Sequence, residues 1–474
     1  MTAILVLDVG TSATKAVLFD PDGSVLQEAS AEIPTDTASG RQEQDAEDWW
    51  RAVQDAVAAL DIADLAAVSL AGTMQNTLAL DADGAPLAPA ILYSDARAGE
   101  EHARLKPALD ALGAGPLIGN DPDPSLTLFK TVWLRDHAPD IFARTAMLVS
   151  GAKDYVANKL TGARTTDPTQ ATTTGLMDIV TRDWSQPVLD AAGLDRALLP
   201  GIVAADAIIG TVMPGLGLPE GTPVVNGCGD AGAATLGAGV SEAGQAYVYL
   251  GTTGWVARVV PIDGPRDPLP VYTLAHPFPG QAIEIAAILS AGDCVDWLRD
   301  ALGDVDLETL EAGAQAVDAN PPDALFLPYL KGERNPFHDD AVRGAFLGLD
   351  RGDGASVLFY AVLEGVALAI RHNLEALGAA PAELGLLGGG GESALWPQLI
   401  ADATGLPVRP AELPTAATAF GALRLATRAL GLPDPVARAQ GRAIEPRADL
   451  VARADARFRR FLSATAFARE FRGR

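Results

Sequence analysis

The sequence contains few of the residues that disulfide frameworks and metal centres require. Its 474 residues include two cysteines, Cys228 and Cys294, and five histidines. Two distant cysteines cannot form a disulfide framework, and the histidines are scattered without the spacing of zinc ligands. This usage favours a reducing compartment, so we predict that the protein is cytoplasmic.

Basic residues are also scarce. Lys and Arg number 35 against 61 Asp and Glu, and the formal net charge is −26. Such acidity argues against a nucleic-acid partner, because phosphate backbones bind to basic patches. No apolar run is long and uncharged enough for a membrane helix, and no basic segment precedes an apolar one at the N-terminus. We therefore expect neither a membrane partner nor a signal peptide.

Strand and helix patterns alternate along the chain and then start again. Three strands are expected within residues 4–30, followed by a helix at 45–60 that Asp45 caps. Helices are expected at 136–145 and 152–160. Three further strands lie between residues 245 and 287, again followed by a helix. The pattern predicts an α/β fold of two related domains, 1–240 and 241–474, with a cleft between them.

Two hairpins with the same polar turn mark the two halves. The first, ILVLDVGTSATKAVLFD at 4–20, ends its first strand on Asp8. The second is YVYLGTTGWVARVV at 247–260. Backbone amides and hydroxyls at such turns can bind phosphate, and Asp8 could do so through Mg²⁺. The candidate phosphate-binding residues are Gly10, Thr11, Ser12, Gly251, Thr252 and Thr253.

One such hairpin could be an ordinary turn with a polar tip. Two copies, about half the chain apart, favour a pair of phosphate-binding hairpins. This pair is a feature of the ATP site in the actin-like fold, the RNase H-like fold shared by actin, Hsp70 chaperones and sugar kinases.

The segment GCGDAG at 227–232 follows a strand and opens a helix, as dinucleotide-binding turns do. Asp230, however, would then stand where the pyrophosphate must bind, and two anions would compete for one helix N-terminus. The same position suits a carboxylate that the helix N-terminus keeps ionised and that accepts a hydroxyl proton. An Asp that only caps the helix is the structural alternative.

Two other strand exits carry candidate ligand-binding residues. In GTMQN at 72–76, Met74 could pack on a sugar and Gln75 could hydrogen-bond its hydroxyls. The glycines of GGGGES at 388–393 could let a flat base or ribose lie against the backbone. Both segments could equally be ordinary loops. No G-x-S-x-G or Walker A motif is found, so phosphoryl transfer is the chemistry that the hairpins and Asp230 jointly favour.

The motifs together resemble those of the FGGY carbohydrate kinases, along nearly the whole chain. The similar blocks include the first hairpin, QDAEDWW, PAILYSDARA, SLTLFKTVWLRDHAP, KDYVANKLTG, NGCGDAGAATLGAG, LGTTGW, FLPYLKGERNPFHDDAVRGAFLGL, VLEGVALAI and GGGGESALWPQLIADATGLPV. The resemblance implies ATP-dependent phosphorylation of a ketopentose, D-xylulose first, with Mg²⁺ as the metal. Another ketose or a polyol, and a non-catalytic actin-like nucleotide switch, are the alternatives. It also implies a homodimer.

The resemblance assigns roles to individual residues. Asp230 corresponds to the general base, and Asp8 to the N-terminal aspartate near Mg²⁺. Met74 and Gln75 fall on the pair that contacts the sugar. The nucleotide and its phosphates would be lined by Gly251, Thr252, Thr253, Gly292, Gly390 and Asp296.

Two departures concern the sugar site. Gln75 stands where a histidine is usual, and Ala231 where an asparagine is usual. We therefore expect an altered set of hydrogen bonds to the sugar.

Overall fold

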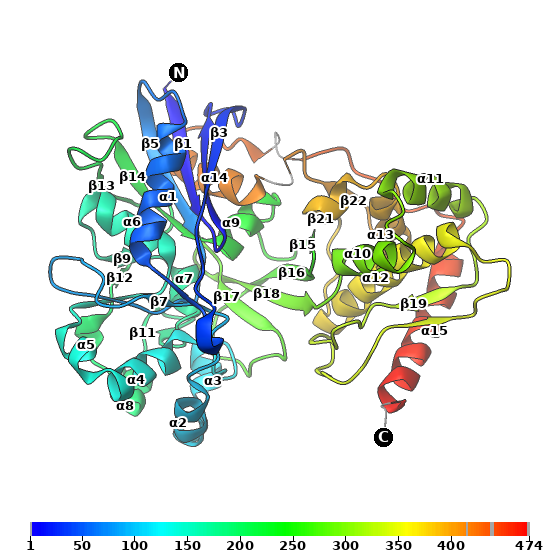
Figure 1. The fold of residues 1–474 in the computed structure, drawn as a ribbon, viewed down its shortest axis with the longest axis horizontal. Coiled ribbons are helices and arrows are strands. Elements are labelled where there is room, and N and C mark those ends of the chain that lie inside the picture. The colour runs from blue at the N-terminus through cyan, green and yellow to red at the C-terminus, as the bar shows by residue number, and fades with distance from the viewer. Residues whose placement is uncertain (1, 414–415, 437–439, 472–474) are drawn as a thin grey trace.

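Two six-stranded sheets organise the computed structural model, which describes residues 2–413, 416–436 and 440–471. The order is β13-β14-β5-β1-β2-β3 in the N-terminal sheet and β17-β18-β16-β15-β21-β22 in the C-terminal sheet. In Figure 1 the N-terminal sheet lies at the upper left, and strands β16 and β18 lie between it and the helices on the right. The described residues thus have the predicted mixed α/β architecture.

Three strands of the N-terminal sheet end at the same edge. β1 (Ala3–Val9) pairs antiparallel with β2 (Ala13–Phe19) and parallel with β5 (Leu65–Gly72), which pairs parallel with β14 (Pro223–Gly229). The register places Val9 opposite Gly72, and Gly72 opposite Gly229. The turn after β1, the exit of β5 and the start of the following helix are therefore neighbours. The outer strands are β3 (Val25–Glu32) and β13 (Ile208–Thr211).

The C-terminal sheet repeats the hairpin. β15 (Ala246–Leu250) pairs antiparallel with β16 (Gly254–Pro261) and parallel with β21 (Leu384–Leu387). β18 (Gln281–Ile288) pairs with β16, as predicted for the third strand. The sequence patterns missed β17 (Tyr272–Ala275), which forms one edge of this sheet; β22 (Val408–Pro410) forms the other.

Helices from both ends of the chain cover the N-terminal sheet. α1 (Ala46–Ala58) begins after Asp45, whose side chain accepts from Glu47 N, so the predicted cap is confirmed. α6 (Ala152–Thr161) lies on the same side. The other face is packed by α9 (Asp230–Gly237) and α14 (Ala417–Ala429), which comes from the far end of the sequence.

Glycines permit a close crossing of α9 and α14. A Cβ atom on Gly237 would lie 1.9 Å from Ala417 O, and one on Gly421 would lie 1.8 Å from Ala233 O. No side chain fits at either position without moving a backbone. Helix α14 is therefore fitted directly against the helix that begins with Asp230.

The predicted helix at 136–145 is confirmed in its main part, but it begins later than expected. α4 (Thr127–His137) ends and α5 (Pro139–Arg144) begins around Pro139, whose ring cannot continue the preceding helix. The sequence patterns also missed α2 (Gly99–Leu112) and α3 (Ala114–Ile118). The remaining elements of this region are α7 (Pro168–Thr172), α8 (Gln186–Ala192), β4 (Glu43–Gln44), β6 (Leu78–Leu80), β7 (Ala90–Ile91), β8 (Met147–Val149), β9 (Thr165–Thr166), β10 (Met177–Asp178), β11 (Asp183–Trp184) and β12 (Gly201–Ile202).

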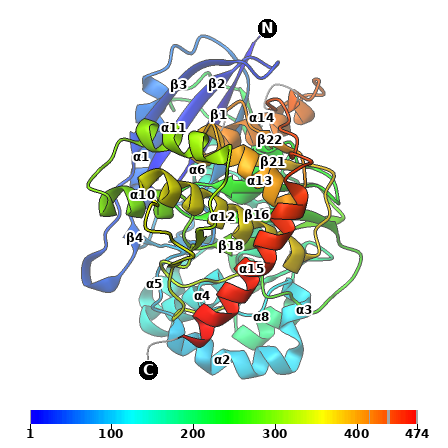
Figure 2. The ribbon, with the colours of Figure 1, turned by 90° about the vertical axis from the view of Figure 1, so that its right-hand side faces the viewer.

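Helix α12 (Ala355–Leu377) forms the centre of the C-terminal core. It is long and apolar enough to cross a membrane by length and composition, which the sequence analysis did not anticipate. Most of its apolar window is buried inside the protein, so it is a core helix here. α10 (Gly292–Ala301), α11 (Leu307–Asp318) and α13 (Trp396–Thr404) pack around it, with β19 (Leu325–Leu327) and β20 (Ala345–Leu347) nearby. Figure 2 shows α15 (Val451–Glu470) running diagonally across this face.

Candidate functional site

The first hairpin turn lies at the shared edge of the N-terminal sheet. Asp8 is paired across the hairpin with Lys15, and Gly10 N donates to Ala13 O at 3.0 Å. The turn is fastened to the β5 exit because Thr11 Oγ1 donates to Thr73 Oγ1 at 3.3 Å. Ser12 is exposed. The tip of the predicted phosphate-binding turn is therefore exposed, while hydrogen bonds hold the residues at its base.

Asp230 is the first residue of α9, at the same edge of the sheet. Its Oδ1 accepts from Ala231 N at 2.8 Å. Burial and then the nearby Asp8 carboxylate raise the pKa of Asp230 to about 7, although the Ala231 amide opposes this. Burial raises the pKa of Asp8 to about 6, with Lys15 opposing. Desolvation and the second carboxylate therefore raise the pKa of Asp230 despite its place at the helix N-terminus, and its role as an ionised base stays a prediction.

A carboxylate with such a pKa is well suited to accept a proton near neutral pH. General bases are most effective when their pKa lies close to the working pH. Asp230 and Asp8 are both half-buried, so solvent or substrate can reach them. The pair also concentrates negative charge in one place, as a site for a cation requires.

Met74 lies directly beside the turn that carries Asp230. A Cβ atom on Gly229 would lie 2.1 Å from the Met74 sulfur, so the glycine leaves room for this side chain. Gln75, the next residue, is half-buried and has a positive φ of 64°. The structure thus brings Met74, Gln75 and Asp230 together, as the resemblance implied.

Three turns of the C-terminal half converge in the same way. Gly292 N donates to Gly251 O at 2.8 Å, and a Cβ atom on Gly292 would lie 2.6 Å from that oxygen. A Cβ atom on Gly390 would lie 2.7 Å from Leu250 Cβ. Thr252 and Thr253 are exposed at the tip. The three proposed nucleotide-lining segments at Gly251–Thr253, Gly292 and Gly390 are therefore neighbours.

Asp296 is the candidate that the structure does not bring into these turns. It lies one helical turn beyond Gly292 on α10, with a side chain that is 67% exposed. Its recorded partner is Arg299, at 3.9 Å. The geometry gives no contact between Asp296 and the glycine turns.

A tyrosine connects the two halves beside Asp230. Tyr247, on β15, is fully buried, and its hydroxyl lies 3.1 Å from Thr235 Oγ1 on α9. Trp255 Nε1 donates to the same hydroxyl at 3.3 Å. The helix that presents Asp230 is therefore attached to the hairpin that carries Gly251.

Sequence reasoning missed a buried charged cluster behind this edge. Lys153 Nζ lies 2.6 Å from Asp154 Oδ1 and 3.0 Å from Asp167 Oδ2, and all three side chains are inaccessible. Burial lowers the pKa of Lys153, but the two carboxylates raise it by more, and the net shift is upward. In the sequence, only the adjacent Lys and Asp of the block KDYVANKLTG could have indicated this cluster. A buried Lys or Asp is rarely found without a charged partner.

Gln170 was also missed. It is fully buried, its Nε2 donates to Ser150 O at 2.6 Å, and its Oε1 has no partner. That oxygen would lie 3.4 Å from a Cβ atom on Gly229, so it is close to the Met74 and Asp230 turn. A buried acceptor without a donor marks a place where a ligand or water can bind.

The donor set at this edge suits magnesium better than a transition metal. No cluster of three or more His, Cys, Asp or Glu side chains that could hold a metal occurs within residues 2–413, 416–436 and 440–471. Mg²⁺ usually binds one or two carboxylates and takes its other ligands from water and phosphate. Asp8, with its raised pKa beside Asp230, fits that requirement.

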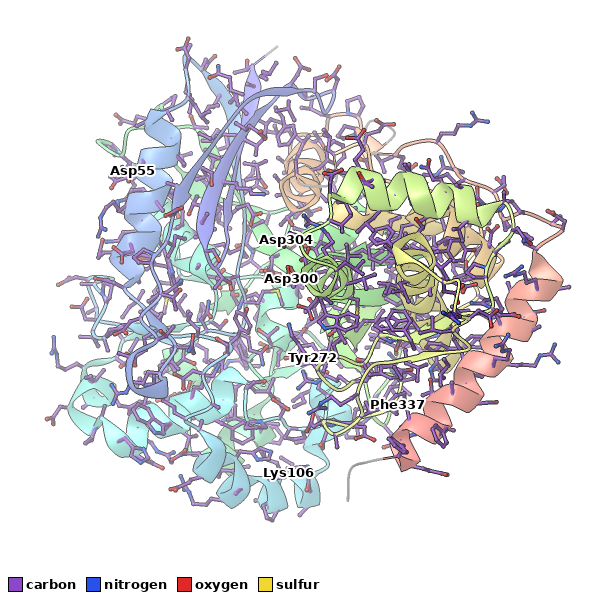
Figure 3. The ribbon with its side chains drawn as sticks, turned by 45° about the vertical axis from the view of Figure 1, so that its right-hand side comes forward. Asp55, Lys106, Tyr272, Asp300, Asp304 and Phe337 are labelled. Atoms are coloured by element: carbon purple, nitrogen blue, oxygen red, sulfur yellow. The ribbon has the colours of Figure 1, made fainter. Side chains whose placement is uncertain are left out.

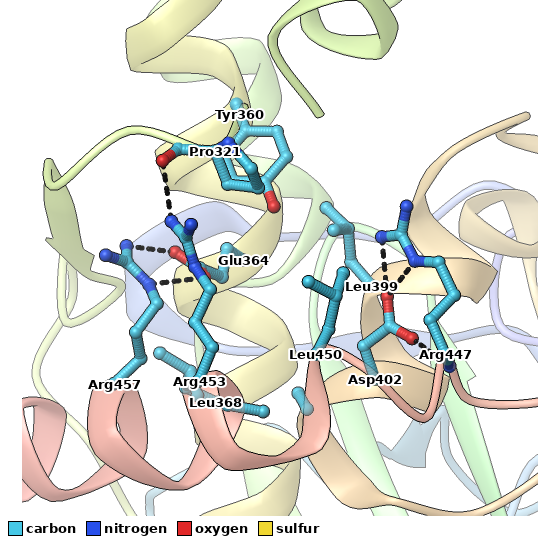
Figure 4. Close-up of a pocket in the computed structure, with 12 residues that line it drawn as sticks. Pro321, Tyr360, Glu364, Leu368, Leu399, Asp402, Arg447, Leu450, Arg453 and Arg457 are labelled. Atoms are coloured by element: carbon cyan, nitrogen blue, oxygen red, sulfur yellow. Dashed lines mark hydrogen bonds and ion pairs between the residues drawn. The ribbon is translucent and has the colours of Figure 1, made fainter. Parts of the chain in front are cut away.

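A small cavity elsewhere has a different role. It measures about 30 Å³ and lies between α12, α13 and α15 (Figure 4). Two arginines of its lining form ion pairs: Arg457 with Glu364, and Arg447 with Asp402 and Asp318. Arg453 donates to the backbone oxygens of Pro321 and Pro322, and these contacts together attach the C-terminal helix to the core.

The geometry therefore defines a class of protein: an enzyme of the actin-like fold with two phosphate-type hairpins and a carboxylate of raised pKa between them. The FGGY family of carbohydrate kinases matches this chain in both parts, the N-terminal domain at residues 3–237 and the C-terminal domain at 246–430. The chain belongs to the FGGY family of carbohydrate kinases. Enzymes of this family use ATP, with Mg²⁺ as the usual metal ion, and the chain is a sugar kinase.

Individual relatives are similar over most of their length. The xylulose kinase of Escherichia coli (strain K12) is 32% identical over 431 residues, covering 89% of this chain and 88% of the relative. The autoinducer-2 kinase of an Enterobacter species is 31% identical, covering 91% and 87%. The crystal structure of xylulose kinase from Rhodospirillum rubrum superposes with a TM-score of 0.89 at 27% identity, covering 100% of each chain. Relatives of comparable similarity thus differ in their named substrates.

Proposed function

We propose that this kinase phosphorylates D-xylulose to D-xylulose 5-phosphate, in pentose catabolism. Several similar proteins are xylulose kinases, and the placement of Met74 and Gln75 beside Asp230 carries the proposal. Another ketose or polyol is the alternative substrate, because an autoinducer-2 kinase is almost as similar and Gln75 and Ala231 depart from the usual residues. We also propose a cytoplasmic location and a homodimer.

The residues divide the reaction between them. Asp230 accepts the proton of the sugar hydroxyl as that oxygen attacks the γ-phosphorus of ATP, and ADP leaves from the opposite side. The amides and hydroxyls of the Gly10–Ser12 and Gly251–Thr253 turns bind phosphate oxygens. Asp8 holds Mg²⁺, which neutralises phosphate charge when bound. Gly292 and Gly390, with Asp296 further along α10, line the nucleotide.

A coupled ADP-release assay tests this function. The panel contains D-xylulose, L-xylulose, D-ribulose, L-ribulose, glycerol and common polyols, and we expect D-xylulose to have the highest kcat/KM. If another compound on the panel has the highest kcat/KM, the D-xylulose assignment is wrong. If no compound on the panel is phosphorylated, the D-xylulose assignment fails and the non-catalytic nucleotide switch gains support.

A pair of variants tests the base. Asp230→Asn should lower kcat by about 10²- to 10⁴-fold, the usual contribution of a general base, while ATP still binds. Asp55→Asn is the matched control, because Asp55 is an exposed aspartate on α1 (Figure 3). Sugar turnover by Asp230→Asn equal to that of Asp55→Asn would show that Asp230 is not the base.

A further inference from the structure

The backbone at Gln75 is held in an unusual conformation. Its φ of 64° lies in the left-handed region, which few non-glycine residues adopt. Lys130 Nζ donates to Gln75 O at 3.2 Å and to Leu92 O at 2.7 Å. On the next residue, Asn76 N donates to Ser150 O at 2.9 Å. Such conformations persist where the surroundings fix them, so the position of this side chain is determined by its neighbours.

The side chain of Gln75 is the end of a chain of hydrogen bonds. Gln75 Nε2 donates to Ser125 Oγ at 2.8 Å, and Ser125 Oγ donates to Asp123 Oδ1. Ser125 N also donates to Asp123 Oδ1, at 2.9 Å. The three residues come from the β5 exit and from the loop before α4, two segments far apart in the sequence.

The direction of this chain follows from the chemistry of its members. An ionised carboxylate can only accept, and a serine hydroxyl has one proton. Because that proton goes to Asp123, Ser125 must accept from Gln75. The Gln75 amide can meet this need only through its NH₂ group, and this fixes the carbonyl oxygen on the other side. Within the described residues, Gln75 Oε1 has no hydrogen-bond partner.

The surroundings of this oxygen favour a neutral ligand. Met74 packs against the Gly229 turn, and Asp230 and Asp8 add two carboxyl groups at the same sheet edge. Asp123 contributes a third on the Gln75 side. An anionic group would be repelled by these carboxylates, and a carbonyl or carboxylate oxygen could not donate to Gln75 Oε1.

Tyr272 supplies a complementary donor from the C-terminal sheet. Its hydroxyl is buried without a hydrogen-bond partner in the part of the chain that the structure describes, and its ring packs in the same apolar cluster as Met74 and Ala231. Burial and the proximity of Asp123 raise the pKa of this phenol, so it stays protonated. In Figure 3 it lies near the middle of the molecule.

We propose that Asp123 and Ser125 are positioning residues for specificity: they turn the Gln75 carbonyl toward the substrate, so the site selects a neutral polyhydroxy compound that donates a hydroxyl proton there. This inference rests on the proposed sugar-kinase function and names the class of sugar. It gives Gln75 the role of an acceptor, which a histidine in its place need not have.

Hydroxyl-deleted sugars test the proposal. The kcat/KM of the best ketose is compared with those of its deoxy analogues, each lacking one hydroxyl. For one analogue the kcat/KM of the wild-type enzyme should be about 10- to 100-fold lower than for the full sugar, because a buried polar group is then left unpaired. In Ser125→Ala and in Gln75→Asn, that loss should fall below about 3-fold, mainly through a higher KM for the full sugar. Asparagine tolerates the positive φ but is too short to reach Ser125.

Controls separate positioning from general damage. In Asp123→Asn the new amide can donate to Ser125, so the direction of the hydrogen bonds from Gln75 is no longer fixed. This variant should also discriminate less between the full sugar and the deoxy analogue. Asp121→Asn should keep it, because Asp121 is 73% exposed and pairs with Lys106 at the surface. The melting temperature of each variant shows that it is folded.

Each result decides one question. If the best sugar is phosphorylated but Ser125→Ala keeps the full wild-type discrimination, the relay is overturned while the kinase function stands. Phosphorylation of an aldonate such as gluconate as efficiently as the best ketose would overturn the selection of neutral substrates. If no sugar on the panel is phosphorylated, the proposed function fails and this inference fails with it.

Discussion

Replacing Lys153 by methionine should greatly destabilise the N-terminal half of the protein. The ammonium is inaccessible and lies 2.6 Å from Asp154 and 3.0 Å from Asp167, which are also inaccessible. Removing one partner of a buried ion pair leaves an uncompensated charge and costs about 3 to 5 kcal/mol in the free energy of unfolding. A domain of 150 to 250 residues loses about 2 to 4 °C per kcal/mol, so the melting temperature should fall by roughly 6 to 20 °C.

Lys159→Met on the same helix is the matched control. Lys159 pairs with Glu47 at 2.8 Å, but the two side chains are 28% and 44% exposed. An exposed pair of this kind contributes about 0 to 1 kcal/mol. Differential scanning calorimetry of both variants measures the difference. Equal losses for the two variants would refute the argument from burial.

The loss should also depend on pH. Burial raises the pKa of Asp154 even with Lys153 in place, and removing the ammonium should raise it further. A carboxyl whose pKa is raised in the folded state destabilises the fold only at a pH high enough to ionise it. The loss of stability caused by Lys153→Met should therefore grow as pH rises. The Lys153→Met deficit should therefore be smaller at pH 5 than at pH 8. A deficit that does not change with pH would contradict this.

Further predictions follow from the shared sheet edge and the helix crossing. Asp230→Asn should raise the melting temperature at pH 8 but not at pH 4. The pKa of Asp230 is about 7 in the folded protein against an ordinary 3.8, so ionising this carboxyl costs at most about 4 kcal/mol of folding stability once the pH exceeds 7. An equal gain at pH 8 and pH 4 would contradict the raised pKa. Gly421→Ala should destabilise by more than about 2 kcal/mol in thermal unfolding, since its Cβ would overlap Ala233 O. Gly99→Ala, in open space at the start of α2, should have no cost, and comparable losses in both would show that the crossing can relax.

Local patterns predicted the hairpins and the strand exits. The first hairpin and α1 are determined by neighbouring residues, such as Gly10 in the turn and Asp45 at the cap, so their signals are short-range. The same patterns pointed to Asp8, Asp230 and Met74, to which the resemblance then assigned roles, and the structure places these residues along one edge. The split near residue 240 and the individual roles of these residues stay predictions.

The missed features depend on contacts between distant segments. Ser125 lies 50 residues after Gln75 and gives no local sign of its bond to that side chain. The raised pKa of Asp230 could not be predicted, because it depends on burial and on Asp8, which lies on another strand. Helix α2 was missed because it carries Pro107 and only a weak apolar stripe.

The contact between α14 and the N-terminal sheet has a consequence for synthesis. When the first 240 residues have left the ribosome, α14 does not yet exist, and the sheet face that includes Ile4, Val6 and Val17 lacks the cover that this helix provides. Phe420, which packs edge-on against Phe19 with ring centroids 6.2 Å apart, is made long after Phe19. Nascent chains with such exposed apolar faces aggregate readily and engage chaperones. This face of the N-terminal sheet is therefore fully covered only after α14 has been made.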